Sequence, residues 1–266
     1  MAKRLNLEGM TALVTGGGSG MVLEYARQLA AQGCTLILVS NRPEELTAAA
    51  GALQDRYGVT VATLEADLAE RDAATRVLGW CDAQGFTVDI LINNAGVFFM
   101  EYLGAGNLGK ARTMMALHVE TTTEMCILFG ERMKQRGRGY ILNMASMTAR
   151  IPAPGIAVYS ASKAYLESVG RGFSYEMRPF GVYVATISPA AVDTGLYPLG
   201  DRLRKALRRL GVIRTPEWLV RRALRALFHG RRLVRPGGMN FLLPPLIGVL
   251  PARTIDRLGM KWIFRK

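Results

Sequence analysis

The stretch TALVTGGGSGMVLEYARQLA, residues 11–30, passes from a short apolar run through a glycine-rich turn into a helical pattern. Glycine lets the backbone turn tightly and approach a pyrophosphate, whose charge is favoured at the N-terminus of the following helix. Because strand, turn and helix follow in the order of a dinucleotide-binding unit, we expect this turn to bind phosphate, with a purely structural turn as the alternative. The turn residues concerned are Gly16, Gly18, Ser19, Gly20 and Met21.

Six further short apolar runs follow, and helical patterns separate them. Several runs are rich in Val, Ile and Thr, as buried parallel strands are. The runs cover 34–40, 59–66, 88–93, 139–145, 182–188 and 232–237, and the clearest helical patterns cover 20–32, 43–57 and 216–230. Strands that alternate with helices predict an α/β fold with a doubly wound parallel sheet of about seven strands.

The basic residues are concentrated at the C-terminal end of the chain. The net charge of the 266 residues is +13, to which residues 1–200 contribute −1 and residues 201–266 contribute +14. This split, without an aromatic platform or a recognised module, argues against nucleic-acid binding. The basic end predicts either a solvated face or contact with an acidic substrate, an acidic partner or an anionic lipid surface.

The sequence contains no sign of a metal site, a secretory signal or a membrane span. Cys34, Cys81 and Cys126 are far apart and lack the spacing of a metal site or disulfide framework. No apolar stretch approaches the ~20 residues of a membrane helix, and no apolar run follows the basic residues of the N-terminus. We therefore expect a soluble, cytoplasmic protein without a metal ion.

Ser146, Tyr159 and Lys163 lie within residues 143–168, NMASMTARIPAPGIAVYSASKAYLES. Tyr159 and Lys163 are four residues apart and therefore share a helix face. A tyrosine hydroxyl, with its usual pKa of ~10, is a poor acid near neutrality, but a cation one turn away stabilises the phenolate and lowers that pKa. Ser146 adds a hydroxyl that can hold a carbonyl or alcohol oxygen. Together these residues predict proton transfer opposite a hydride carrier.

The second apolar run ends in Ser40-Asn41-Arg42. An acidic residue there would accept hydrogen bonds from the ribose hydroxyls of NAD, and none is present. Arg42 can pair with a 2′-phosphate instead, so the sequence favours NADP (NADPH) as the cofactor, with an unengaged surface arginine as the alternative.

In order and spacing, these motifs resemble those of the short-chain dehydrogenase/reductase family of the Y-x-x-x-K type. The resemblance covers about residues 7–195 and implies one Rossmann-type domain over residues 1–266, assembled as a homodimer or homotetramer. It is carried by TGGGSG at 15–20, Asp67, NNAG at 93–96, Ser146, YSASK at 159–163 and SPAAVDT at 188–194.

The resemblance also implies roles for individual residues around the cofactor. Asp67 and Leu68 would contact the adenine, and Asn93 would stabilise the fourth strand beside the cofactor. Lys163 would bind the nicotinamide ribose. Beyond the glycine-rich turn, the implied cofactor-binding residues are Asn41, Arg42, Asp67, Leu68, Asn93, Ala95, Gly96, Tyr159, Lys163, Pro189, Val192 and Thr194.

Two positions depart from the family pattern. Val22 replaces the last glycine of T-G-x-x-x-G-x-G, so we expect it to push the first helix outward or to weaken cofactor binding. His118 stands about where the family has an asparagine that helps to hold a water in the proton relay. Its imidazole donates and accepts, so it would either replace that asparagine or be a packed histidine without a role.

The residues after the sixth run are expected to form a substrate-covering segment, 194–230, and an apolar and basic tail, 241–266. Leucines at 199, 203, 207 and 210 among Arg and Lys indicate a basic amphipathic helix, which either covers a lipophilic substrate with an acidic group or packs on the core. The tail stretch FLLPPLIGVLP, residues 241–251, is too short to span a bilayer. The tail would line a pocket, bury a subunit contact or touch an anionic membrane surface weakly, and residues 254–266 resemble an interfacial helix.

We expect an NADP-dependent oxidoreductase that interconverts a ketone and a secondary alcohol on a small lipophilic, hydroxysteroid-like substrate. Tyr159 would transfer the proton, and Lys163 would lower the pKa of the tyrosine. Ser146 would orient the substrate oxygen, while His118 would serve the proton relay. A 3-ketoacyl thioester is the alternative substrate, since the C-terminal part weakly resembles the family branch of 3-ketoacyl reductases and hydroxysteroid dehydrogenases. A catalytically degenerate nucleotide sensor or scaffold is the alternative of another class, which the intact Ser-Tyr-Lys set opposes.

Overall fold

The computed structural model describes residues 7–16, 20–151, 153–193, 205, 208–209, 212–251, 253–255 and 257. Several expectations from the sequence concern residues that are not among these. Those for Gly18, Ser19 and Thr194, for the leucines at 199, 203, 207 and 210, and for the tail from residue 258 onward lie outside the described residues.

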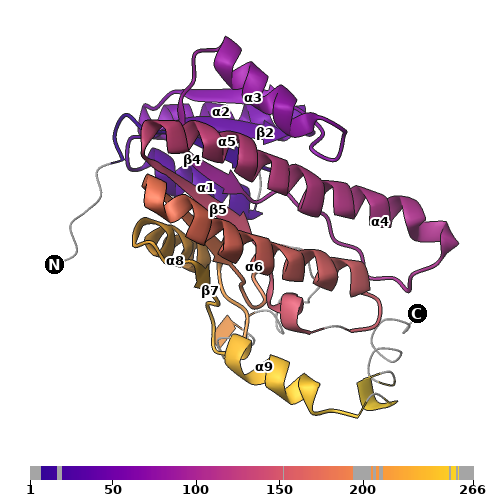
Figure 1. Cartoon of the computed structure of the whole chain (residues 1–266). Coiled ribbons are helices and arrows are strands. Elements are labelled where there is room, and N and C mark those ends of the chain that lie inside the picture. The colour runs from indigo at the N-terminus through magenta and orange to yellow at the C-terminus, as the bar shows by residue number, and fades with distance from the viewer. Residues whose placement is uncertain are drawn as a thin grey trace.

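Seven parallel strands form one sheet in the order β3-β2-β1-β4-β5-β6-β7, which confirms the predicted α/β fold (Figure 1). The chain order reverses between β1 and β4, and ligands of such sheets bind in the crevice at the carboxyl ends of the strands at this point. The strands are β1 (Thr11–Thr15), β2 (Thr35–Ser40), β3 (Val61–Glu65), β4 (Val88–Asn93), β5 (Gly139–Met144), β6 (Val182–Ile187) and β7 (Leu233–Val234).

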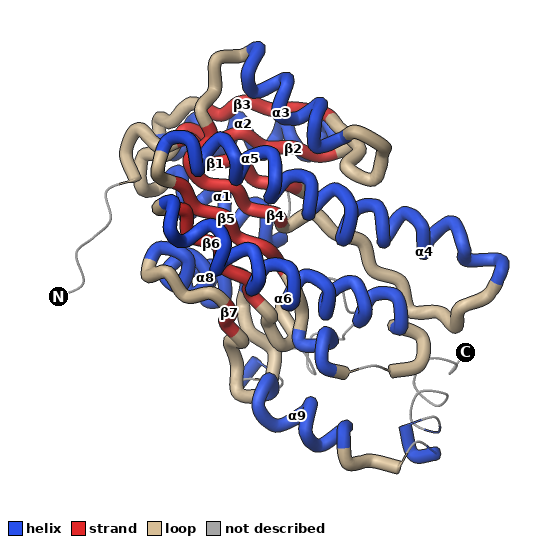
Figure 2. The backbone as a smooth tube through the Cα atoms, viewed as in Figure 1, coloured by secondary structure: helices blue, strands red, loops and turns tan. Residues whose placement is uncertain are grey.

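Helices cover both faces of the sheet (Figure 2). On one face, α1 (Gly20–Ala30), α2 (Pro43–Tyr57) and α8 (Pro216–Phe228) share a hydrophobic cluster with the strands. The other face carries α3 (Ala73–Ala83), α5 (Thr122–Arg136) and α6 (Ala157–Met177). Because helices cover the sheet from both sides, all six residues of β4 are buried, and these include the polar Asp89 and Asn93.

The residues at the ends of α2 and α8 explain where these helices begin and end. Pro43 occupies the first turn of α2, and Gly58 ends that helix with a φ of 65° in the left-handed region. Thr215 caps α8, where its hydroxyl accepts a hydrogen bond from the Trp218 N–H at 3.2 Å. α8 ends at Phe228, close to the predicted end at residue 230.

Two helical features were not predicted from the sequence pattern. The six residues between α4 (Leu108–Met115) and α5 form a π-helix, η2 (Ala116–Thr121). Near the C-terminus, α9 (Met239–Gly248) continues through Pro244 and Pro245. Within the described part of the chain, no helix is sufficiently long and apolar to cross a membrane.

Candidate active site

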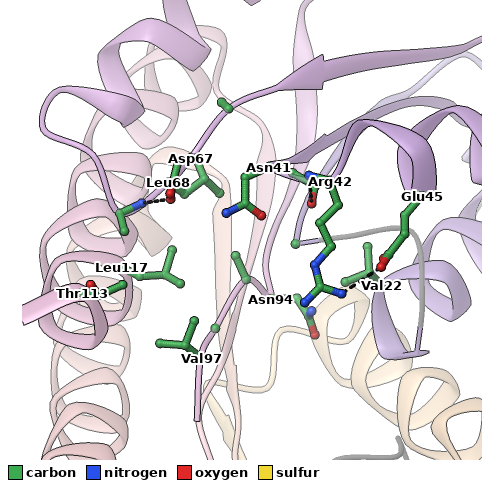
Figure 3. Close-up of a pocket in the computed structure, with 16 residues that line it drawn as sticks. Val22, Asn41, Arg42, Glu45, Asp67, Leu68, Asn94, Val97, Thr113 and Leu117 are labelled. Atoms are coloured by element: carbon green, nitrogen blue, oxygen red, sulfur yellow. Dashed lines mark hydrogen bonds and ion pairs between the residues drawn. The ribbon is translucent and has the colours of Figure 1, made fainter. Parts of the chain in front are cut away.

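A pocket of about 360 Å³ opens at the carboxyl ends of the strands around β1, where the strand order reverses (Figure 3). The ends of β2 and β3, the segment after β4 and the start of the glycine-rich turn form its walls. The predicted cofactor residues that line it are Gly16, Asn41, Arg42, Asp67, Leu68, Ala95 and Gly96. These residues, which lie far apart in sequence, therefore share one cavity at the place where such sheets bind dinucleotides.

The backbone of the pocket requires glycine at Gly16. Its φ is +103°, and a Cβ atom there would lie 2.9 Å from the Cα of Ala95. The Thr15 hydroxyl accepts hydrogen bonds from the N–H groups of Asn94 and Ala95, both at 3.1 Å. The first turn and the segment after β4 are thus held in close contact. The tight glycine backbone at the switch point of the sheet fits a bound dinucleotide.

Arg42 lies at the end of β2 and forms an ion pair with Glu45 at 2.8 Å (Figure 3). Glu45 also lines the pocket, from the first turn of α2. Glu45 was not predicted as a pocket residue, although its i,i+3 spacing from Arg42 was a usable signal in the sequence. Because the Arg42 side chain is 65% exposed, the pair contributes at most about 1 kcal/mol, which an incoming phosphate can outcompete.

Val22 is buried on α1 and lines the same pocket. Its side chain packs in the cluster shared by α1, α2 and α8. Figure 3 shows it beside Arg42 and Glu45, so the position that departs from the family glycine is part of the pocket wall. The methyl groups of Val22 occupy space that a glycine would leave open.

Helix α6 carries Tyr159 and Lys163 into the interior at the end of β5. Lys163 is 5% exposed, and its Nζ donates a hydrogen bond to the Met144 carbonyl at 2.9 Å. The same Nζ lies 5.6 Å from the centre of the Tyr159 ring. Burial lowers the pKa of Lys163 to about 7. The predicted tyrosine and lysine are therefore adjacent, with the lysine held in place by the end of β5.

Ser146 follows β5 by two residues and begins the 3-10 helix η3 (Met147–Arg150). Its hydroxyl accepts a hydrogen bond from the Thr148 N–H at 3.3 Å. The Met147 N–H donates to the Pro189 carbonyl at 2.9 Å, which joins the serine segment to the residues after β6. β5 thus positions both Ser146, through the chain, and Lys163, through the Met144 carbonyl.

His118 is fully buried in the π-helix η2. Its Nε2 accepts a hydrogen bond from the Val97 N–H at 3.0 Å, so Nδ1 carries the proton and donates it to the Ser162 Oγ at 2.9 Å. The Ser162 hydroxyl in turn donates to the Tyr159 carbonyl at 2.8 Å. Burial, assisted by the charge of Lys163, lowers the pKa of His118 to about 2, which makes the ring neutral. Both ring nitrogens are occupied by protein groups.

Other predicted cofactor residues are not part of the wall of this pocket. Asn93 is buried and donates to Asn143 Oδ1 at 2.9 Å, which links β4 to β5. Val192 is buried and pairs with Arg214 through an isolated bridge. Gly20 begins α1 with a φ of +59°, and Met21 packs against the adjacent core.

A partly buried polar network joins η3 to α9, and no pattern in the sequence predicted it. The Arg150 Nη2 donates to the carbonyl oxygen of Asn240 at 2.7 Å and to its Oδ1 at 2.9 Å. In a regular helix that carbonyl would accept from residue 244, but Pro244 has no N–H. The proline inside α9 therefore leaves an acceptor for Arg150.

The same network continues to the end of β6 and to α6. The Asn240 Nδ2 donates to the Ser188 carbonyl at 3.0 Å. The Ser188 hydroxyl donates to Glu167, which also forms an ion pair with Arg235 at 2.5 Å. Glu167 lies one helical turn after Lys163 on α6. α9, the segment after β6 and the helix that carries Tyr159 are thus connected by hydrogen bonds.

Comparison with known proteins agrees with this geometry. The family model for short chain dehydrogenases matches residues 10–199. The chain belongs to the short-chain dehydrogenase/reductase family. The family assignment and the doubly wound fold expected from the motifs are confirmed, and the chain is an oxidoreductase built to bind a nicotinamide cofactor.

The relatives of this short-chain dehydrogenase include 3-oxoacyl-CoA reductases and hydroxysteroid dehydrogenases. A very-long-chain 3-oxoacyl-CoA reductase of Anas platyrhynchos is 29% identical over 95% of this chain and 80% of its own length. A 17-beta-hydroxysteroid dehydrogenase type 3 of Danio rerio is 30% identical over 71% of this chain, which spans 62% of that relative. Among solved structures, a bulky-bulky ketone specific alcohol dehydrogenase from Comamonas testosteroni has 25% identity and a TM-score of 0.75, with 97% of this chain and 92% of that chain covered.

Proposed function

We propose that the protein is an NADP-dependent oxidoreductase that interconverts a ketone and a secondary alcohol on a lipophilic substrate. The observation that carries this proposal is the pairing of Tyr159 with the buried ammonium group of Lys163, next to the segment that begins with Ser146. Bound NADPH supplies the hydride. The remaining chemistry, which is to orient the carbonyl and to deliver a proton to its oxygen, belongs to these three residues.

The Tyr159 hydroxyl donates the proton to the carbonyl oxygen in reduction and takes it back in oxidation. Lys163 in its charged form favours the phenolate left behind, because a cation nearby stabilises the anion. The Ser146 hydroxyl donates a hydrogen bond to the substrate oxygen and fixes its position. In this proposal Lys163 also holds the nicotinamide ribose, and Pro189, Val192 and Thr194 flank the nicotinamide.

The pocket around β1 holds the adenosine half of the cofactor. Arg42 pairs with the 2′-phosphate once the phosphate displaces Glu45. Asp67 and Leu68 line the pocket where the adenine would lie. The glycine-rich turn, with Gly16, Gly18, Ser19, Gly20 and Met21, holds the pyrophosphate at the start of α1.

We assign His118 a positioning role in this proposal. Its two nitrogens bind the Val97 N–H and the Ser162 hydroxyl, and Ser162 binds the carbonyl of Tyr159 itself. The ring also packs edge-on against Tyr159, with a centroid distance of 5.9 Å. These contacts support a neutral histidine that orients the tyrosine, in preference to one that passes protons.

A hydroxysteroid-like ketone is the proposed substrate, and a 3-ketoacyl thioester is the second candidate. The second is favoured by two observations. The duck 3-oxoacyl-CoA reductase aligns over 95% of this chain, and the charge of +14 in residues 201–266 complements an acidic carrier group on the thioester. A cytoplasmic location and assembly as a homodimer or homotetramer are part of the same proposal.

Turnover of a panel of ketosteroids and 3-oxoacyl-CoA esters, followed by the absorbance of NADPH, tests the proposal. We expect one class to be reduced with NADPH and more slowly with NADH. A nucleotide sensor or scaffold would bind NADPH with no turnover of any carbonyl compound, and that result would reject the enzymatic function.

A further inference from the structure

The chemistry proposed above does not use the outer face of α9. The helix has no charged residue, and two of its ten residues are buried. Phe241, Leu242 and Leu246 are 70%, 67% and 57% exposed, and Val249, directly after the helix, is 78% exposed. Single exposed apolar residues are ordinary, whereas three on one short helix and a fourth directly after it form an apolar surface that requires a partner.

The positions of these residues place them together. Leu242, Leu246 and Val249 follow the i, i+4, i+7 spacing of one helix face, and Phe241 extends it. Figures 1 and 2 show α9 at the edge of the molecule, away from the two helical layers that cover the sheet. We call these four residues the α9 face.

The charge of the C-terminal segment favours one kind of partner. Residues 218–266 contain eleven Lys and Arg but one acidic residue, Asp256. Arg253 and Arg257 follow α9 closely and are exposed. An apolar surface with basic residues at its end matches the boundary of an anionic bilayer, where acyl chains and phosphates lie next to each other. A second copy of this chain would instead bring another strongly basic segment to the same surface.

We propose that the α9 face docks on the surface of anionic lipid bilayers, with Arg253 and Arg257 at the level of the headgroups. The start of α9 is fixed to η3 by the hydrogen bonds between Asn240 and Arg150, and η3 begins directly after Ser146. Docking therefore brings the substrate side of the site close to the bilayer. Docking itself requires only the α9 face, whereas entry of a lipophilic substrate from the bilayer also rests on the proposed function.

Co-sedimentation of the full chain with vesicles, in the absence of substrate and cofactor, tests the docking. The vesicles contain phosphatidylcholine alone or phosphatidylcholine with roughly a quarter phosphatidylglycerol. We expect binding to the anionic vesicles that weakens as salt is raised, because the screening length falls from about 10 Å at 0.1 M to about 3 Å at 1 M. Neutral vesicles should bind much less protein.

Two double variants separate the apolar and the basic contributions. Leu242→Gln with Leu246→Gln should weaken binding to anionic vesicles about ten-fold or more, since both side chains lose their place in the apolar layer. Arg253→Gln with Arg257→Gln should weaken it about five-fold for each side chain at low salt and little at high salt. Ile127→Gln on α5 is the matched control, because Ile127 is 54% exposed and lies on a different helix, and it should bind like the wild type.

Three results would overturn the proposal. The first is no sedimentation of the wild type with anionic vesicles at low salt. The second is an equal loss of binding in Ile127→Gln and in the leucine double variant. The third is a smaller sedimentation coefficient of the leucine double variant without vesicles, which would identify the α9 face as a contact between subunits. Circular dichroism verifies that each variant is folded.

Discussion

Lys163 is a buried amine whose charge the proposed mechanism needs. Burial lowers its pKa to about 7, so the charge is present below that pH and lost as the pH rises through it. We expect the rate of ketone reduction under saturating NADPH to fall above about pH 7, because the neutral amine no longer favours the phenolate of Tyr159. Lys163→Arg keeps its charge at high pH. A pH profile of that variant with the same fall would assign the titration to another group.

Substitutions of His118 test whether this side chain positions Tyr159 or only packs in the core. His118→Leu removes the shared partner of the Val97 N–H and the Ser162 hydroxyl, at a total cost of about 1–3 kcal/mol, because Ser162 is buried while Val97 is partly exposed. We expect this variant to lose both stability and turnover, while His118→Asn, which still donates and accepts, retains substantial activity. The free energy of unfolding and kcat are the measurements. Wild-type behaviour of both variants would leave the histidine without a role.

Arg42 and Glu45 decide between the two forms of the cofactor. Arg42→Ala should weaken NADPH binding about ten-fold or more, because it removes the charged partner of the 2′-phosphate. NADH has no 2′-phosphate, so its binding should stay nearly unchanged. Glu45→Gln should strengthen NADPH binding a few-fold, since it removes the competing carboxylate. Titration of both nucleotides by fluorescence measures this, with Arg56→Ala at the other end of α2 as the control. Equal losses for NADH and NADPH in Arg42→Ala would contradict the assignment.

At the scale of elements, predictability followed the strength of local patterns. All seven strands were predicted because each lies within one of the short apolar runs of the sequence. The helices α2 and α8 match the helical patterns predicted at 43–57 and 216–230, and Pro43 and Thr215 stand at their starts. α9 was not, since its two internal prolines normally exclude a helix and the hydrogen bond that replaces the missing one comes from Arg150, 90 residues away. A contact of that range leaves no periodic signal.

Asn240 gives a direct measure of how strongly α9 is attached. Asn240→Leu preserves the volume of the side chain but leaves Arg150 with one fewer acceptor, and leaves the carbonyl groups of Ser188 and Pro236 without this donor. We expect a loss of about 2–4 kcal/mol in the free energy of unfolding and a higher KM. Gln135→Leu on the exposed surface of α5 should change stability by less than about 0.5 kcal/mol. A similarly small effect of Asn240→Leu would show that the network contributes little.

For the whole molecule, the sequence predicted the family and the fold, and it predicted that Tyr159 and Lys163 share one helix. Tyr159 and Lys163 are four residues apart on one helix, so their adjacency follows from local geometry. The two hydrogen-bond partners of His118 depend on how the chain returns to the same place, and no single segment contains that information. The uneven charge was visible from composition, but the structure located the exposed apolar face next to it.

The measurement that tests the central proposal most directly compares wild type and Tyr159→Phe on the ketone that the wild type reduces. The substitution removes only the hydroxyl, so we expect the dissociation constant for NADPH to stay within about two-fold while kcat falls by roughly 10²–10⁴, the usual contribution of a general acid. Unchanged turnover in Tyr159→Phe, with the fold and NADPH binding intact, would contradict the proposal that Tyr159 supplies the proton.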